Sequence, residues 1–217
     1  MFSTTDTPKC ALCDGTGWRA VGEGRERRVT RCACRGDATA ARVSAALPEL
    51  YREARMMDFV GPLQDSAQRW LEKPTCGLLL MGPNGAGKTH LAAAIVRARI
   101  ESRKSAVLKF AADFYRELRA TFNSPDADAT ELAIMSRLTD AEFLVLDDIG
   151  AGSLSDFERR STLDLLECRL TRLRPTVVTT NLTVEQIGTL MDERISSRLS
   201  AYTRIAVTGH DRRAARK

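Results

Sequence analysis

Hydrophobic and polar positions divide the chain into three regions with different patterns. Residues 1–36 are rich in cysteine, glycine and arginine and poor in core-forming side chains. Residues 37–75 contain an alanine-rich stretch that Pro48 interrupts, which predicts a helical segment followed by a connection. Residues 76–217 alternate short apolar runs with longer amphipathic stretches. We therefore predict a small N-terminal module, a helical linker and one larger domain.

The apolar runs of the third region have the length and composition of buried strands. Five strands are predicted, at residues 76–81, 106–110, 143–147, 176–180 and 204–207. Helical patterns lie between them, at residues 88–103, 112–122, 131–138, 156–173 and 184–199. Because such alternation builds βαβ units, we expect an α/β fold in which helices sandwich a five-stranded parallel sheet.

A glycine-rich loop follows the first predicted strand. It matches the phosphate-binding pattern G-x-x-x-x-G-K-[ST] and lies between a strand and a helix, as that pattern requires. The glycines let backbone N–H groups face phosphate oxygens, and the helix N-terminus adds a partial positive charge. We expect Lys88 to reach the β- and γ-phosphates of ATP and Thr89 to bind Mg²⁺. The predicted nucleotide contacts are Gly82, Pro83, Asn84, Gly85, Ala86, Gly87, Lys88, Thr89 and His90.

Two later strands end in polar side chains suited to nucleotide hydrolysis. Four apolar residues at 143–146 precede Asp147 and Asp148, which is the Walker B arrangement. Asp147 is predicted to hold Mg²⁺, and Asp148 is predicted to orient and polarise the attacking water. The strand at 176–180 is followed by Asn181, whose amide could bind both the γ-phosphate and that water. An isolated asparagine at such a place is also common as a helix N-cap or turn residue.

Four of the six cysteines lie near the N-terminus, as Cys10-x2-Cys13 and Cys32-x-Cys34 separated by 18 residues. Two close thiolate pairs across a loop of this length suit tetrahedral Zn²⁺. An iron–sulfur cluster and free thiols are the alternatives, although free thiols would leave this segment, which has few core residues, without a stabilising cross-link. The N-terminus lacks the charged and apolar segments of a secretory leader, and we expect a cytoplasmic protein in which metal is favoured over disulfides.

Composition limits the classes of function. With 217 residues, 43% of them hydrophobic and 28% charged, the chain is expected to be globular rather than disordered. Its longest apolar run is far shorter than the roughly 20 residues that span a bilayer, so no membrane partner is expected. The net charge of +5 is a mild indication of an anionic partner such as nucleic acid.

The motifs in their order along the chain resemble a known family. After the phosphate loop come Leu-Val-Leu-Asp-Asp-Ile-Gly at 144–150, Pro-Thr-Val-Val-Thr-Thr-Asn-Leu-Thr at 175–183 and Asp-Glu-Arg-Ile-Ser-Ser-Arg-Leu at 192–199. This set resembles the AAA+ ATPases of the DnaC/DnaI helicase-loader group, which are related to the IstB transposition helpers. Residues 47–59 also resemble the segment that leads into the ATPase core of these loaders. The resemblance extends over residues 45–215.

The resemblance implies roles for further residues. Asn181 matches the sensor-1 position, and Arg198 matches an arginine finger that acts on ATP held by a neighbouring subunit. Arg194 lies one helical turn earlier and is the alternative finger, while Arg213 matches sensor-2. A finger acting in trans implies self-association into a ring or spiral. Asp148 stands where many AAA+ proteins carry glutamate. Because few residues follow the last predicted strand, we also expect a truncated C-terminal lid, as in the loader group.

The resemblance also implies a function, namely the ATP-dependent loading of a replicative ring helicase onto single-stranded DNA. The N-terminal module and residues 37–60 would bind the helicase. The DNA contacts would come from the helix at 112–122, with Arg116 and Arg119 as candidates, and from the loop after Walker B. In that helix, the spacing of the apolar side chains is that of a core-facing stripe. The stripe consists of Phe114, Leu118 and Phe122.

Three other functions are weighed against helicase loading. A transposition helper shares the core but generally lacks a four-cysteine module. A small-molecule kinase would need a substrate lid and would not need Asn181 or an arginine acting in trans. The intact set of Lys88, Thr89, Asp147 and Asp148 argues against an adaptor that does not hydrolyse nucleotide.

Overall fold

The structure is a computed structural model that describes residues 12–13, 18–22, 27–74, 77–123 and 130–208. By its internal contacts the chain divides into two compact units, residues 1–45 and 46–217. Cys10 and Arg213, predicted as a zinc ligand and as sensor-2, lie outside the described residues.

The first unit contains a two-stranded hairpin that the hydrophobic pattern did not predict. Strand β1 (Trp18–Val21) pairs antiparallel with β2 (Arg28–Arg31), with Trp18 opposite Arg31. Nearly all of the strand residues are exposed, so the apolar–polar alternation that reveals a half-buried strand is missing. Helix α1 (Cys34–Ala46) begins three residues after β2.

The second unit is built on a five-stranded parallel sheet with the order β4-β5-β6-β3-β7. Its strands are β3 (Gly77–Met81), β4 (Val107–Phe110), β5 (Leu144–Ile149), β6 (Thr176–Thr180) and β7 (Thr203–Ala206). All five strands were predicted, and the expected α/β class is confirmed. The first strand, β3, lies between the fourth and the fifth, so its carboxyl end is at a point where the strand order reverses.

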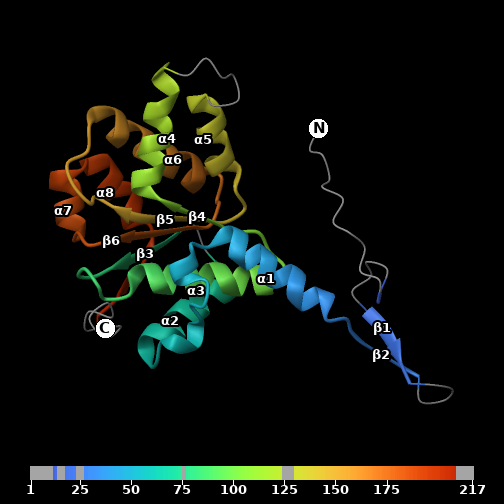
Figure 1. The fold of residues 1–217 in the computed structure, drawn as a ribbon. Helices are drawn as coiled ribbons and strands as arrows, with labels where there is room; N and C mark the ends of the chain where they lie inside the picture. Colours follow the sequence, from blue (N-terminus) through green and yellow to red (C-terminus); the bar gives the residue numbers. More distant parts are fainter. Residues whose placement is uncertain (1–11, 14–17, 23–26, 75–76, 124–129, 209–217) are drawn as a thin grey trace. The chain divides into compact units, whose positions relative to one another are not determined.

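Helices cover both faces of the sheet, and Figure 1 shows α2 and α3 on one side and α4, α5 and α6 on the other. These helices are α2 (Pro62–Glu72), α3 (Lys88–Glu101), α4 (Ala111–Ala120), α5 (Glu131–Asp140) and α6 (Asp156–Thr171). One core cluster joins side chains of α4, α5 and α6 to the sheet residues Leu79, Leu146 and Val178, all fully buried. No helix in the described part of the chain combines the length and the apolar composition needed to cross a bilayer.

The single helix predicted at 184–199 is wrong in one respect, because the structure has two helices there. Helix α7 (Val184–Leu190) ends at Met191, and α8 (Glu193–Ser200) begins after Asp192. The Asp192 side chain caps α8 by accepting a hydrogen bond from the backbone N of Arg194 at 2.7 Å. Both helices still direct an apolar face to the core, which is why the periodicity ran through the break.

The second unit begins with a segment of mostly short turns. Two 3₁₀ helices, at Glu49–Tyr51 and Met56–Asp58, precede α2. Gly61 caps α2 with a φ of 65°, and Pro62 occupies the first helical position, where its missing N–H costs nothing.

Candidate nucleotide-binding site

The glycine-rich loop connects the buried strand β3 to helix α3. Gly87 caps α3 with a φ of 100°, a conformation that favours glycine. A Cβ at Gly82 would lie 2.1 Å from the carbonyl oxygen of Val207, because the end of β7 passes directly beside the loop. The first turn of α3 leaves backbone N–H groups without partners inside the helix, and these groups can bind phosphate oxygens.

Lys88 lies at the start of α3 and turns back over the loop. Its Nζ donates hydrogen bonds to the carbonyl oxygens of Gly82 and Pro83, both at 2.9 Å. The side chain is buried, so its positive charge is held close to the loop backbone. A phosphate on the loop would meet this ammonium group directly.

A chain of hydrogen bonds links the start of α3 to the ends of β5 and β6. The Thr89 hydroxyl donates to Oδ2 of Asp147 at 2.9 Å, and the Thr179 hydroxyl donates to Oδ1 of the same carboxylate at 2.7 Å. Adjacent ligands of octahedral Mg²⁺ lie about 3 Å apart, since each is 2.0–2.1 Å from the ion. The Thr89 and Asp147 oxygens therefore have the separation and the chemistry that Mg²⁺ requires.

Asp147 is a buried carboxylate whose proton affinity reflects its surroundings. It is 1% exposed, and this burial raises its pKa above the ordinary value. The hydrogen bonds from Thr179 and Thr89 act in the opposite direction, and Lys88 lowers the pKa further by its charge. Burial thus disfavours the charged form of this carboxylate, whereas the two hydroxyls and Lys88 favour it, as a bound cation would.

Asp148 differs from its neighbour in both position and conformation. It is exposed and has a φ of 62°, and the pairing of β5 with β6 shifts register between Leu146 and Ile149. Its backbone N donates to the Thr179 hydroxyl at 2.8 Å, so one threonine holds both acids. This left-handed residue turns the second carboxylate out of the strand. The hydrophobic pattern did not identify Thr179, since threonine is ordinary in a buried strand.

Asn181 follows β6 at the same edge of the sheet, as predicted. Its Oδ1 is buried, and among the described residues it has no hydrogen-bond partner. A buried polar atom without a partner is costly unless a water or ligand completes it. This amide is therefore suited to a ligand at the sheet edge.

The His90 side chain faces the turn before α2, and its contact with nucleotide stays a prediction. Its Nε2 lies 2.6 Å from Oδ2 of Asp58, and its ring packs against Phe59 with centroids 5.7 Å apart. The side chain thus joins α3 to the turn before α2. Sequence patterns did not predict the contact with Asp58, because the two residues lie 32 positions apart.

The two candidate finger arginines lie on α8, and each pairs with an acidic side chain of its own chain. Arg198 forms an ion pair through Nε with Glu167 of α6, and its side chain is about one-third exposed. Arg194 is more exposed and is held by Asp192, with Nε 3.1 Å from Oδ1 and Nη2 3.0 Å from Oδ2.

A cleft of about 290 Å³ opens beside the two acids, between α4 and the loop after β5. Arg116 and Arg119 line it together with Asp147, Asp148 and Glu158. The structure thus brings both predicted DNA-contacting arginines close to the two acids that are predicted to act in hydrolysis.

The apolar stripe of α4 agrees only in part with expectation. Phe114 and Leu118 are fully buried, but Phe122 is 59% exposed. The reason is that α4 ends at Ala120, and Phe122 instead makes an edge-to-face contact with Phe157, with ring centroids 4.9 Å apart.

Three of the four predicted zinc ligands lie together in the first unit. The sulfur atoms of Cys13, Cys32 and Cys34 are all within 4.8 Å of one another, and those of Cys13 and Cys34 are 3.4 Å apart. In a tetrahedral site with Zn–S bonds of 2.3 Å, sulfur atoms lie about 3.8 Å apart. The three described thiols therefore fit a thiolate zinc site in spacing and in chemistry.

Comparison with known proteins identifies relatives of the second unit. Residues 64–203 match the family described as IstB-like ATP binding protein. The replicative helicase loader DnaC of Escherichia coli K12 is 30% identical over 121 residues, which are 56% of this chain and 49% of that protein. DnaC of Buchnera aphidicola subsp. Baizongia pistaciae is 28% identical over 127 residues, which are 58% of this chain and 51% of that protein. The chain spans about half the length of these curated relatives.

Solved structures resemble the chain in fold. The DnaC helicase loader superposes with a TM-score of 0.65 at 20% identity, covering 74% of this chain and 100% of that one. DnaI gives 0.65 at 22% identity, covering 75% and 95%. DnaA of Aquifex aeolicus, solved with AMPPCP, gives 0.65 at 16% identity, covering 76% and 54%. These likenesses show a P-loop AAA+ fold.

Proposed function

Because this chain belongs to the IstB-like ATP-binding protein family, we propose that it is a Mg²⁺-dependent ATPase. The observation that carries the proposal is the chain of hydrogen bonds from Thr89 through Asp147 to Thr179 below a glycine-rich loop. The Thr89 hydroxyl and the Asp147 carboxylate would hold Mg²⁺ beside the phosphates. Bound Mg²⁺ would offset phosphate charge as the terminal phosphoryl group is transferred.

Each residue of the site has a proposed task. Lys88 binds the β- and γ-phosphates, and backbone N–H groups of residues 82–90 bind phosphate oxygens. Asp148, exposed at the strand end, orients the attacking water and polarises it by accepting a hydrogen bond from it. The buried amide of Asn181 forms a hydrogen bond with the γ-phosphate or with that water. Because Asp148 is shorter than glutamate, we expect slow turnover that depends on assembly.

The base of the nucleotide is proposed to lie on the β7 side of the loop. Asp147, which would hold Mg²⁺, lies on the β5 side of β3, and this leaves the other side for the nucleoside. A cleft of about 840 Å³ opens there between α2 and β7, with Phe59, Val60 and Thr208 in its lining. Arg213 remains the proposed sensor-2 residue.

The proposed assembly is a ring or spiral in which Arg198 of one protomer completes the site of the next. Its ion pair with Glu167 would hold the guanidinium ready on α8 until a neighbour's phosphate replaces the carboxylate. Arg194 is the alternative finger. An arginine supplied in trans is typically worth about 10³–10⁵ in rate.

At the level of the whole protein, we propose that the chain loads a replicative ring helicase onto single-stranded DNA in the cytoplasm. The similarity to the helicase loader DnaC supports this proposal. Cys10, Cys13, Cys32 and Cys34 would hold Zn²⁺ and so stabilise a module that, with residues 37–60, binds the helicase. Zinc would replace the missing apolar core of this unit.

The catalytic proposal is tested by mixing inactive subunits. The ATPase rate per chain should rise with protein concentration and with single-stranded DNA. Lys88→Ala and Arg198→Ala proteins should each be inactive, and mixing them should restore activity, because a site with intact Lys88 can then face an intact Arg198. A monomer that hydrolyses ATP rapidly at any dilution would contradict the proposal.

A second candidate function, that of a transposition helper, is favoured by the family description itself. The full chain, used as bait against a purified ring helicase and a purified transposase, separates the two functions. Retention of the helicase with loss of binding in Cys32→Ser protein supports the loader. Retention of the transposase alone supports the helper.

A further inference from the structure

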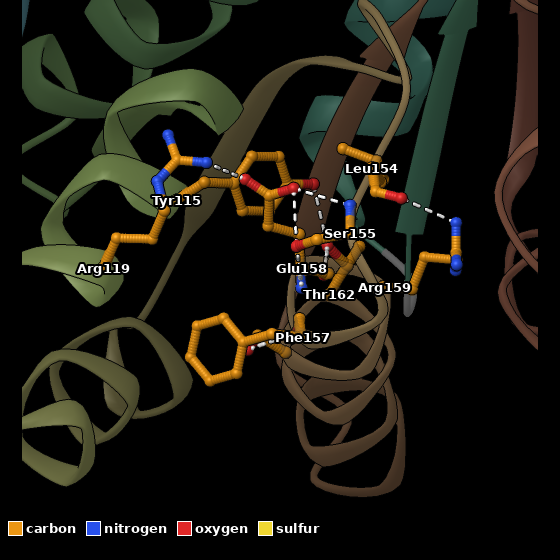
Figure 2. Close-up of polar contacts among 9 residues, drawn as sticks. Tyr115, Arg119, Leu154, Ser155, Phe157, Glu158, Arg159 and Thr162 are labelled. Atoms are coloured by element: carbon orange, nitrogen blue, oxygen red, sulfur yellow. Dashed lines mark hydrogen bonds and ion pairs between the residues drawn. The ribbon is translucent and has the colours of Figure 1, made fainter. Parts of the chain in front are cut away.

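A buried carboxylate, Glu158, forms part of the wall of the cleft beside Asp148. Glu158 is 5% exposed, and its two oxygens serve different elements, as Figure 2 shows. Oε1 pairs with Nη1 of Arg119 on α4. Oε2 accepts hydrogen bonds from the backbone N and the hydroxyl of Ser155, at 2.8 and 2.9 Å. Glu158 therefore connects α4 to the beginning of α6.

The ion pair holds Arg119 in one orientation. A buried carboxylate is costly without a counter-charge, and Arg119 provides it. Glu158 in turn fixes the position of the Arg119 side chain, which extends from α4 toward α6 to form this ion pair (Figure 2). The contact therefore reduces the freedom that this long side chain would otherwise have.

The orientation leaves part of the guanidinium available at the surface. A guanidinium has five N–H donors, and the Arg119 side chain remains 56% exposed despite its pair. Arg116 lies one turn earlier on α4, is 73% exposed and lines the same cleft. Two cationic groups thus stand at the rim of a cleft that also contains Asp148.

We propose that Glu158 is a positioning residue that presents Arg119 to a phosphate of a single nucleic-acid strand. This inference rests on the proposed function, which places single-stranded DNA on this chain. Because Glu158 also holds Ser155, it anchors the far end of the loop that follows β5. The proposed strand contact and the proposed hydrolytic acid Asp148 are therefore connected by one short loop, residues 150–155.

A double-mutant cycle on oligonucleotide affinity tests the inference. The full chain with AMPPCP and Mg²⁺ is titrated against a fluorescent oligothymidine, for wild type, Glu158→Gln, Arg119→Ala and the double variant. Glutamine keeps an acceptor for Ser155 but lacks the charge that holds Arg119. Loss of one ordered side chain should weaken binding about three- to tenfold. In the Arg119→Ala background the same change should have no effect, since nothing remains to be positioned.

Arg116 provides the matched control. It lies on the same helix and lines the same cleft, but it pairs with Asp113 at 2.6 Å rather than with Glu158. The effects of Glu158→Gln and Arg116→Ala should therefore multiply. Thermal unfolding of every variant is recorded in parallel, and Arg119→Lys replaces Arg119→Ala if the alanine protein does not fold.

The possible outcomes distinguish a failure of this inference from a failure of the proposed DNA binding on which it rests. A Glu158→Gln effect of equal size with and without Arg119 would mean a general structural role and would overturn the inference alone. Wild-type protein that binds no oligonucleotide would overturn both the inference and the DNA part of the proposed function.

Discussion

Two buried charges lie at opposite ends of the same sheet and are satisfied in different ways. Asp147, at the carboxyl end of β5, is held by the hydroxyls of Thr89 and Thr179. Arg169, at the other end, is 0% exposed. Its guanidinium donates to the carbonyl oxygens of Leu138, Thr139, Ala141 and Pro175 and to the hydroxyl of Thr176, at 2.7 to 3.2 Å.

The comparison shows how a fold separates a structural charge from a functional one. Burial lowers the pKa of Arg169 to about 10, which leaves it charged at neutral pH, and its partners are mostly backbone carbonyls that cannot turn away. Burial raises the pKa of Asp147, whose partners are hydroxyls that can rotate and donate elsewhere. The arginine joins the end of α5 to the start of β6, whereas the aspartate keeps partners that a cation can replace.

The largest expected effect on stability is that of Arg169→Met. Removing the guanidinium leaves several buried carbonyl groups without donors, which should lower the free energy of unfolding by about 3 kcal/mol or more. Denaturant titration measures the loss. Arg172→Met is the control, because Arg172 is exposed and its pair with Asp140 should contribute at most about 1 kcal/mol. Equal losses in the two variants would contradict the comparison.

Asp147→Asn should have the largest effect on activity. Replacing the carboxylate removes the negative ligand proposed for Mg²⁺, and the ATPase rate should fall by at least about a hundredfold. The unfolding midpoint should stay equal or rise, because burial disfavours the ionised form of this side chain. A large loss of stability would instead show that Asp147, like Arg169, has a structural role, and would contradict the comparison.

The smallest effects on stability should come from substitutions of two threonines in β6. These two variants separate the functional end of the sheet from the structural end most directly. Thr179→Val and Thr176→Val each remove one buried hydroxyl from β6 and should each cost about 1 kcal/mol of stability. Only Thr179→Val should reduce the ATPase rate, by about tenfold, because Thr179 orients both acids while Thr176 contacts Arg169. Equal ATPase rates in the two variants would show that the hydroxyl at 179 only supports the strand.

Sequence patterns predicted those features that depend only on residues close together along the chain. The five strands, their alternation with helices and the glycine-rich loop follow from periodicity and spacing over a few residues. The break at Asp192 was missed because the apolar stripe of α7 and α8 continues across it. The hairpin β1–β2 was missed because its exposed strands lack alternation.

Patterns within short stretches of sequence were enough to predict the class of the sheet, the loop that can bind phosphate and the two acids near the end of a buried strand. The packing of separate elements was needed to show that Thr179 holds both acids, that His90 faces Asp58 and that Arg119 faces Glu158. The reason is distance along the chain, since these partners lie 31 to 39 positions apart. Hydrophobic periodicity places each element, but the register and the packing of separate elements choose which polar side chains meet.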